Sequence, residues 1–317
     1  MDSFKLLSAR SVARALAAGA AAALLATGLH GALIDLWPFS HAQFSRYAAP
    51  VTEETLKCLY VVWLIRRGRV GFLVDAAILG FAVGTAFAIV ENVEYLRAIA
   101  EPRVVLWIVR GLGTAILHGA TTAIFAVVSK VLADRRPDRL SVFLPGLLAA
   151  AAIHSLFNHF VLPPLVATAL LLVALPALLL VVFDRSERAT REWLGLGLDS
   201  ELELFESILS GQVLATRVGS YLQSLKAHFP GTAVADMLCL LRIHLELSIR
   251  AKGLLLAREA GFAVPVGQDV RANLRELRYL EQGLGTTGRL AVKPILRRTS
   301  RDLWQVYKLE EAGGVEA

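Results

Sequence analysis

Long apolar runs separated by short polar segments dominate the first 183 residues of the chain. A helix of about 20 apolar residues crosses the hydrocarbon core of a bilayer, which is about 30 Å thick. Six runs therefore predict six spanning helices, at residues 15–36, 51–65, 72–96, 104–131, 142–162 and 164–183. The second run is short and carries Glu53, Glu54 and Lys57 near its start, so we expect that end at the membrane interface or sheltered by neighbouring helices.

The pattern changes from Asp184 onward to amphipathic helices joined by turns. The segments are ELELFESILSG, TAVADMLCLLRIHLELSIRAKGLLLAREA, DVRANLRELRYLEQGL and RLAVKPILRRTSRDLWQVYKL, with GFAVPVGQ and GLGTTG as turns. In the third segment, apolar residues recur at helical spacing: Val270, Leu274, Leu277 and Leu280. We predict an all-α chain, with a polytopic membrane bundle of about six spans at 1–183 and a cytoplasmic α-helical domain at 184–317.

Composition and charge support a membrane protein and give its orientation. Hydrophobic residues make up 56% of the chain, charged residues 19%, and the mean hydropathy is +0.56. The net charge of +6 does not indicate nucleic-acid binding, because the basic residues form short clusters between the apolar runs, where they set topology. Four clusters share one side if both termini are cytoplasmic: Lys5 to Arg14, Arg66 to Arg69, Lys130 to Arg139, and Arg185 to Arg191.

Both ends of the chain allow two interpretations. The first run, behind Lys5, Arg10 and Arg14, resembles a signal peptide or a retained anchor, and the lack of a clear small-x-small site before Trp37 favours the anchor. The last helix is basic beside Trp304, which suits contact with anionic membrane lipid, but we favour the simpler interpretation as a solvated helix face. Its basic residues are Lys293, Arg297, Arg298 and Arg301.

Ionisable and amide side chains inside the apolar runs are the candidates for chemistry, because such groups are costly at membrane depth. They are Glu53, Glu54 and Lys57, then Glu91 and Asn92, then Arg110 and His118, then His154, Asn158 and His159. Each also has a structural explanation. Pro50 and Thr52 suit a helix start with carboxylates in its first turn, and Glu53 and Lys57 suit an i, i+4 ion pair. Glu91 could lie at the membrane interface, and His118 could be a core histidine bonded to a backbone carbonyl. His154 and Asn158 could form a polar contact that holds two helices together.

The expected depth of these residues favours a shared site. With cytoplasmic termini, Glu53 and Glu91 lie toward the outer ends of their spans, as do His154 and Asn158. Taking Arg110 as the outer boundary of the fourth span places His118 about 12 Å below it, at about 1.5 Å per residue. Gly80 and Gly84 allow the third helix a close neighbour. Four helices thus place carboxylates, imidazoles and an amide at a similar depth in the membrane.

This set suits activation of water. A glutamate can take a proton from water while a histidine or asparagine stabilises the oxyanion, and two adjacent carboxylates can supply one base and one acid. Alternatively, His118, His154 and Glu54 could hold zinc with a water in the fourth position, although no HExxH motif supports this. A covalent nucleophile is not expected, because the chain has no GxSxG and neither Cys58 nor Cys239 adjoins a base.

The same residues carry a resemblance to a known family. The segments EETLK from Glu53, DAAILGFAVGTAFAIVENVEYL from Asp75, LHG around His118 and IHSLFNH from Ile153 resemble the ordered motifs of the PrsW family of intramembrane proteases. This family is related to the CAAX prenyl protease and bacteriocin-processing superfamily. The resemblance spans about Pro50 to Leu162, and Lys57 and Glu91 favour the PrsW branch over prenyl-protein processing.

The resemblance implies peptide-bond hydrolysis in or beside a bacterial inner membrane, typically of a single-span anti-sigma factor. It implies Glu53 and Glu54 as paired catalytic carboxylates, with Glu91, His118 and His154 completing the polar centre. Asn158 would donate to the oxyanion, with Lys57 and Asn92 in support. The cofactor stays open: none for a glutamate mechanism, zinc for a metalloprotease. The partners are a single-span protein substrate and lipid, without nucleic acid.

Two other functions are open from the residues alone. A non-catalytic adaptor would use the polar cluster only to hold helices together, so Glu→Gln substitutions would cost stability and leave output intact. A proton-coupled transporter would use the same Glu and His side chains as a relay, although no clear inverted repeat is present.

Overall fold

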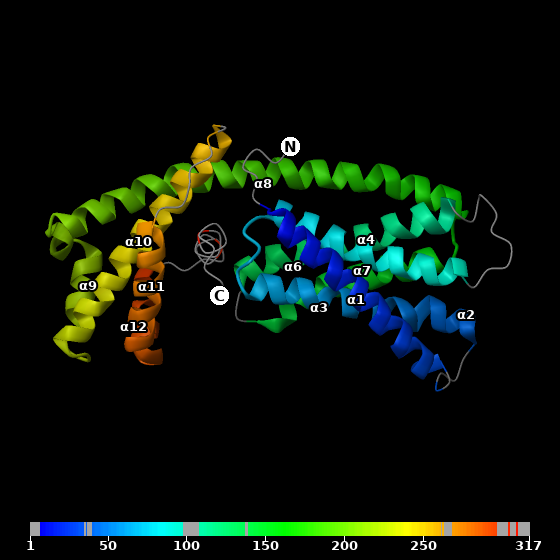
Figure 1. Cartoon of the computed structure of the whole chain (residues 1–317), viewed down its shortest axis with the longest axis horizontal. Helices are drawn as coiled ribbons and strands as arrows, with labels where there is room; N and C mark the ends of the chain where they lie inside the picture. The colour runs from blue at the N-terminus through cyan, green and yellow to red at the C-terminus, as the bar shows by residue number, and fades with distance from the viewer. Residues whose placement is uncertain are drawn as a thin grey trace. The chain divides into compact units, whose positions relative to one another are not determined.

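The computed structural model describes residues 7–34, 36, 40–97, 108–136, 139–260, 262, 268–296, 304 and 309. Within these residues all regular secondary structure is helical, without strands, which confirms the all-α prediction (Figure 1). The chain divides into two compact units, Leu6–Glu187 and a second that contains Arg188–Ala317.

The first unit contains seven α-helices and three short π or 3-10 helices among the described residues. They are α1 (Ala9–Ile34), α2 (His41–Gln43), the π-helix η1 (Phe44–Ala48), α3 (Ala49–Arg66), α4 (Leu73–Arg97), the π-helix η2 (Ile108–Thr114), α6 (Ala115–Arg135), the 3-10 helix η3 (Leu140–Phe143), α7 (Leu144–Asn158) and the start of α8 (Pro164–Leu209).

Five helical segments among the described residues are long and apolar enough to cross a membrane: Ala9–Ile34, Leu73–Arg97, Gly111–Arg135, Leu140–Asn158 and Leu165–Leu209. They correspond to five of the six predicted spans. The remaining prediction falls on α3, which has 18 residues and packs against α1, α6 and α7. Its Glu54 and Lys57 are completely buried, so its charges face protein and not lipid.

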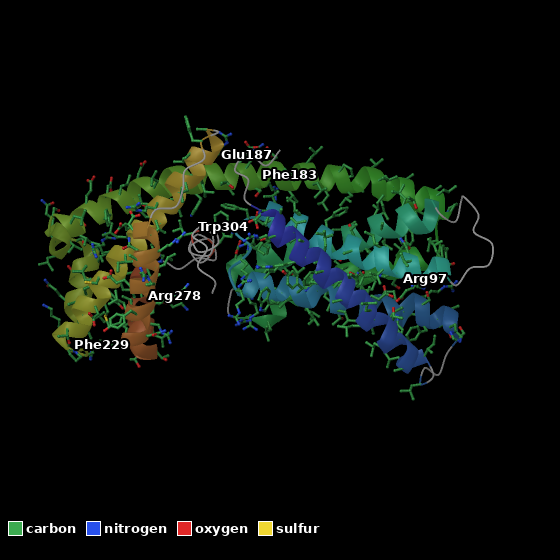
Figure 2. All side chains as sticks on the ribbon, in the orientation of Figure 1. Arg97, Phe183, Glu187, Phe229, Arg278 and Trp304 are labelled. Atoms are coloured by element: carbon green, nitrogen blue, oxygen red, sulfur yellow. The ribbon has the colours of Figure 1, made fainter. Side chains whose placement is uncertain are left out.

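The helix that contains the sixth predicted span is longer than that span. Helix α8 continues past Phe183 and Glu187, which lie on the same helix in Figure 2, and ends only at Leu209. The stretch after Phe183 is charged, but it contains no proline, and Asp184 and Arg188 stand four residues apart, a spacing that supports a helix. ELELFESILSG is therefore the last part of α8 and not a separate helix, and Gly211, with φ 74°, follows its end.

Helices α4 and α6 approach closely, as predicted from the small residues of α4. A Cβ atom on Gly84 would lie 2.0 Å from the carbonyl oxygen of His118, and one on Gly80 would lie 2.7 Å from that of Thr122. Position 84 therefore requires glycine, because no larger side chain fits where the two backbones meet. The contact sets the height of α6, and with it the height of His118, against α4.

The second unit contains η4 (Gln212–Ala215), α9 (Arg217–Leu225), α10 (Gly231–Glu259), α11 (Gln268–Gly283) and α12 (Gly285–Leu296). Its apolar core includes the four residues predicted for one face of α11. GLGTTG holds the break between α11 and α12, where Gly285 has φ 62°. Arg297, Arg298 and Arg301 lie outside the described residues, and Trp304 is buried, so this ring is not exposed to lipid.

Candidate active site

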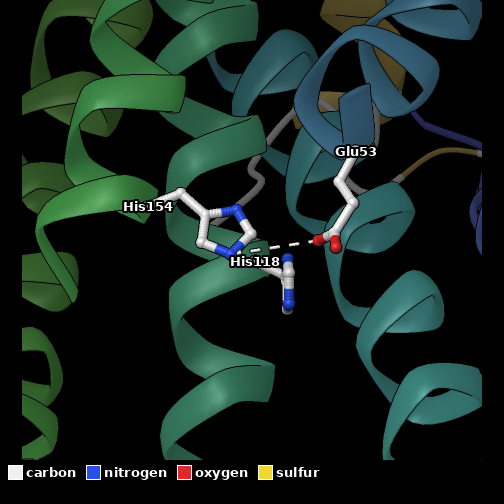
Figure 3. Close-up of side chains that lie close together, drawn as sticks. All are labelled: Glu53, His118 and His154. Carbon is white, nitrogen blue, oxygen red and sulfur yellow. Dashed lines mark ion pairs between the residues drawn. The ribbon is translucent and has the colours of Figure 1, made fainter. Parts of the chain in front are cut away.

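Four helices bring six of the predicted site residues together. Glu53, Glu54 and Lys57 come from α3, Glu91 from α4, His118 from α6 and His154 from α7. Figure 3 shows Glu53, His118 and His154 pointing toward one another from three helices. One donor atom of each of these three side chains lies within 4.8 Å of the others. The expected convergence of these side chains is present in the structure.

The start of α3 differs from the predicted helix cap. The π-helix η1 leads directly into α3, so Ala48 is the cap and the first turn contains no acidic residue, although Pro50 lies at the helix start as expected. Thr52 Oγ1 instead lies 3.1 Å from the Ala48 carbonyl oxygen and 3.0 Å from that of Ala49. The carboxylates therefore lie about one turn inside the helix, where their side chains reach the protein interior.

Glu54 is the most enclosed carboxylate of the site. Its Oε1 accepts hydrogen bonds from Lys57 Nζ at 2.5 Å and from His154 Nδ1 at 2.8 Å, and lies 3.2 Å from Thr121 Oγ1. The described ion pair of Lys57 is with Glu54, three residues before it, where the spacing favoured Glu53. Both side chains are fully buried, and an ammonium beside a carboxylate offsets the cost of removing each charge from water.

His154 turns one ring nitrogen to each glutamate of the pair. A carboxylate accepts hydrogen bonds and cannot donate them, so Nδ1 carries the hydrogen that bonds to Glu54. Nε2 then presents a lone pair, and it lies 3.9 Å from Oε2 of Glu53, the contact drawn as a dashed line in Figure 3. Two acceptors thus face each other across a distance too long for a direct hydrogen bond.

His118 links Lys57 to Glu91. Its Nδ1 lies 2.8 Å from Lys57 Nζ, which can only donate, so Nε2 carries the ring hydrogen and donates to Glu91 Oε2 at 2.8 Å. The ring also packs against Phe87, with centroids 5.1 Å apart, and edge-on to His154 at 4.8 Å. Glu91 is 30% exposed while the other carboxylates are buried, so the network reaches the surface through this residue.

The two predicted amides lie on the edges of the network. Asn92 accepts a hydrogen bond from Thr114 Oγ1 at 2.8 Å, which joins α4 to the end of η2, just before α6. Asn158 Nδ2 donates to the carbonyl oxygen of Ser45 in η1 at 3.0 Å. Its second N–H remains available by chemistry, and its role toward an oxyanion stays a prediction. The side chain of Arg110, taken as a boundary marker, lies outside the described residues.

Two residues of the site were not predicted. Thr121 lies one helical turn after His118 on α6, and this spacing is the signal that could have identified it. His30 comes from α1, where its Nε2 lies 2.6 Å from Thr52 Oγ1 and its Nδ1 lies 3.9 Å from Glu53 Oε1. It follows the buried stripe Ala15, Gly19, Ala22 and Ala26 at helical spacing, which places it on the face of α1 that contacts the bundle.

The donor set fits a divalent metal ion. Two imidazoles and a carboxylate are a common zinc ligand set, and the group found in space uses Glu53, where Glu54 was the predicted carboxylate. Glu54 instead holds Nδ1 of His154, an arrangement that orients imidazole ligands in metal sites. His118 fits with one adjustment, because both of its ring nitrogens are engaged and one must be released to bind a metal.

Comparisons with known proteins agree with this geometry. A family model described as "PrsW family intramembrane metalloprotease" matches residues 7–183. The match covers the whole first unit apart from a few residues at its ends, and it contains every predicted site residue. Searches among curated proteins and among solved structures give no match.

Proposed function

This chain belongs to the PrsW family of intramembrane metalloproteases, and we propose that it hydrolyses peptide bonds of single-span, membrane-anchored proteins with a water held between Glu53 and His154. Family membership makes it a protease of the membrane and decides against the adaptor and the transporter. The substrate class is our proposal, and a bacterial anti-sigma factor is the example that the resemblance suggests.

The facing acceptors of Glu53 and His154 carry this proposal. A carboxylate oxygen and an imidazole lone pair 3.9 Å apart suit a water that donates one hydrogen to each of them. Such a water keeps its oxygen lone pairs for attack on a peptide carbonyl, and Glu53 takes a proton as the bond forms. Glu54 does not fill this role, because its bonded oxygen already accepts from Lys57 and His154.

The remaining polar groups orient His154 and balance the charge of Glu54. Glu54 fixes the tautomer of His154, Lys57 neutralises Glu54 and holds His118, and Asn158 is the proposed donor to the oxyanion. In a metal-bound form, Glu53, His118 and His154 would instead direct their lone pairs at the ion, which would supply a water of lowered pKa and polarise the carbonyl. We propose zinc as that ion, because two imidazoles and a carboxylate suit it.

We also propose the cellular setting from the sequence. Five apolar helices among the described residues support a multi-pass membrane protein. The basic clusters favour a bacterial inner membrane with both termini in the cytoplasm. The partners are then a single-span substrate and membrane lipid.

Protein termini in the membrane provide a test that needs no known substrate. Membranes from cells that express the wild-type chain or Glu53→Gln are labelled at protein N-termini and compared by mass spectrometry. We expect new termini near the outer ends of single-span proteins in the wild-type sample alone. Equal sets of termini in both samples would rule out hydrolysis that depends on Glu53.

The metal is tested on the purified full chain in detergent. Elemental analysis should find about one zinc per chain in the wild type and clearly less in His154→Ala. Chelation should remove cleavage, and added zinc should restore it. Full activity in a metal-free preparation would exclude zinc and leave the glutamate mechanism.

A further inference from the structure

We propose that His30 of α1 is a positioning residue of the active site, which holds Glu53 in place through Thr52 and through its own ring. The inference rests on the proposed function, because it concerns the same glutamate. It assigns α1 a part in the reaction, beyond anchoring the chain in the membrane.

His30 lies beside two neighbouring residues of α3, Thr52 and Glu53. A carboxylate only accepts hydrogens, so the tautomer that stabilises Glu53 carries its hydrogen on Nδ1 and leaves Nε2 to accept from the Thr52 hydroxyl at 2.6 Å. Nδ1 then directs its N–H at Glu53, whose Oε1 lies 3.9 Å away, so the two groups attract each other without a direct hydrogen bond. Because Thr52 and Glu53 are neighbours on α3, the single ring of His30 reaches both the Thr52 hydroxyl and the Glu53 carboxylate.

Packing restricts the ring further. The buried Phe44 of η1 meets His30 edge-on, with ring centroids 5.2 Å apart and planes at 87°. The ring is thus held between η1 on one side and Thr52 on the other, and it is only 20% exposed. A ring held at two points loses little further entropy when it aligns the carboxylate, which is what a positioning residue requires.

Helix α1 is suited to deliver this side chain at a fixed height. Its buried stripe packs on α4, where a Cβ on Gly19 would lie 2.1 Å from the carbonyl oxygen of Val83. Near its end, Thr27 Oγ1 donates to Glu94 Oε2 of α4 at 2.6 Å. His30 follows Thr27 by three residues, so the same end of α1 is bonded to α4 and to α3.

In this arrangement, His30 and His154 lie beside different carboxylate oxygens of Glu53. The His30 contact is to Oε1 and the His154 contact is to Oε2, each at 3.9 Å. Holding the first oxygen from α1 keeps the second directed toward His154 and the proposed water. Loss of His30 should therefore lower the rate of hydrolysis without removing any group that contacts the water.

The test uses the purified full chain added to membranes from cells that express Glu53→Gln, with new protein termini quantified over time. His30→Phe keeps a ring beside Phe44 but loses both polar contacts, and we expect its initial rate to fall about 10- to 100-fold. His30→Gln, whose amide can reach Thr52, should recover most of that loss. Leu29→Ala, at an exposed neighbouring position of α1, is the control and should match the wild type.

Coupling to Thr52 separates positioning from general damage to α1. Thr52→Val should lower the rate, and the double variant with His30→Phe should lose clearly less than the product of the two single losses, because both changes remove the His30–Thr52 contact. If His30→Phe is folded by size exclusion and thermal unfolding yet cleaves at the wild-type rate, or if Gln gives no recovery, the inference is overturned. Absence of new termini with the wild-type chain would instead overturn the proposed function and the inference with it.

Discussion

At the scale of single residues, the site assigns different work to two adjacent glutamates. Glu54 is bonded to Lys57 and His154, while Glu53 faces ring nitrogens of two histidines at 3.9 Å. The sequence predicted the pair but could not divide these roles, because neighbouring helical residues point in different directions and only the surrounding helices decide what each one meets.

Glu53→Gln and Glu54→Gln should therefore differ in stability although both lose activity. The Glu54 change leaves the buried ammonium of Lys57 without its counter-charge, which costs about 3–5 kcal/mol in comparable pairs. The Glu53 change should cost clearly less. Thermal unfolding in detergent measures the difference, with terminus labelling for activity. Equal stability of the two variants would argue against the assigned roles.

Lys57 provides a second test of the buried pair. Lys57→Met alone should destabilise the protein by a similar amount, because it leaves Glu54 charged and unpaired. Adding Glu54→Leu should return most of the stability, since an apolar pair of similar volume replaces the ion pair. Activity should stay absent because His154 loses its acceptor. Recovered cleavage in the double variant would show that this network does not serve the reaction.

At the scale of helices, the sequence predicted the membrane bundle well where apolar runs were uninterrupted. Runs such as 72–96 match α4 within one residue at each end. The π-helix before α3, the long continuation of α8 and the place of His30 were not predicted, because none has a strong local signal. His30 in particular follows a stripe of alanine and glycine whose partner is visible only after α1 packs on α4.

The contact between α4 and α6 yields a prediction at this scale. Gly84→Ala would place a methyl group against the carbonyl oxygen of His118, so the helices must separate, at a cost of about 1–3 kcal/mol. Moving His118 by about 1 Å should lower activity about 100-fold. Gly28→Ala on α1, where a Cβ meets nothing within 4 Å, is the matched control and should be neutral or slightly stabilising. Wild-type cleavage by Gly84→Ala would refute a fixed α4–α6 spacing.

At the scale of the whole molecule, the two units have separate apolar cores, and each unit contains one cysteine. Cys239 is exposed in the second unit, whereas Cys58 is buried in α3. This difference provides a natural probe for the proposed orientation, in which everything after α8 lies in the cytoplasm.

A membrane-impermeant maleimide should therefore label Cys239 only after spheroplasts are permeabilised. The matched control is Arg97→Cys in a Cys239→Ser background, because Arg97 is exposed at the end of α4 that we place outside. This variant should be labelled in intact spheroplasts. Labelling of Cys239 before permeabilisation would reverse the orientation.

The charges of the buried network have a further consequence. In the part of the chain that the structure describes, the carboxylates of Glu53, Glu54 and Glu91 gather around the ammonium of Lys57. Removing several carboxylates from water is costly unless cations lie beside them, so this centre favours a bound cation over a neutral ligand. The electric field of the carboxylates therefore supports metal binding together with the ligand geometry, and it disfavours acidic residues of a substrate at the scissile bond.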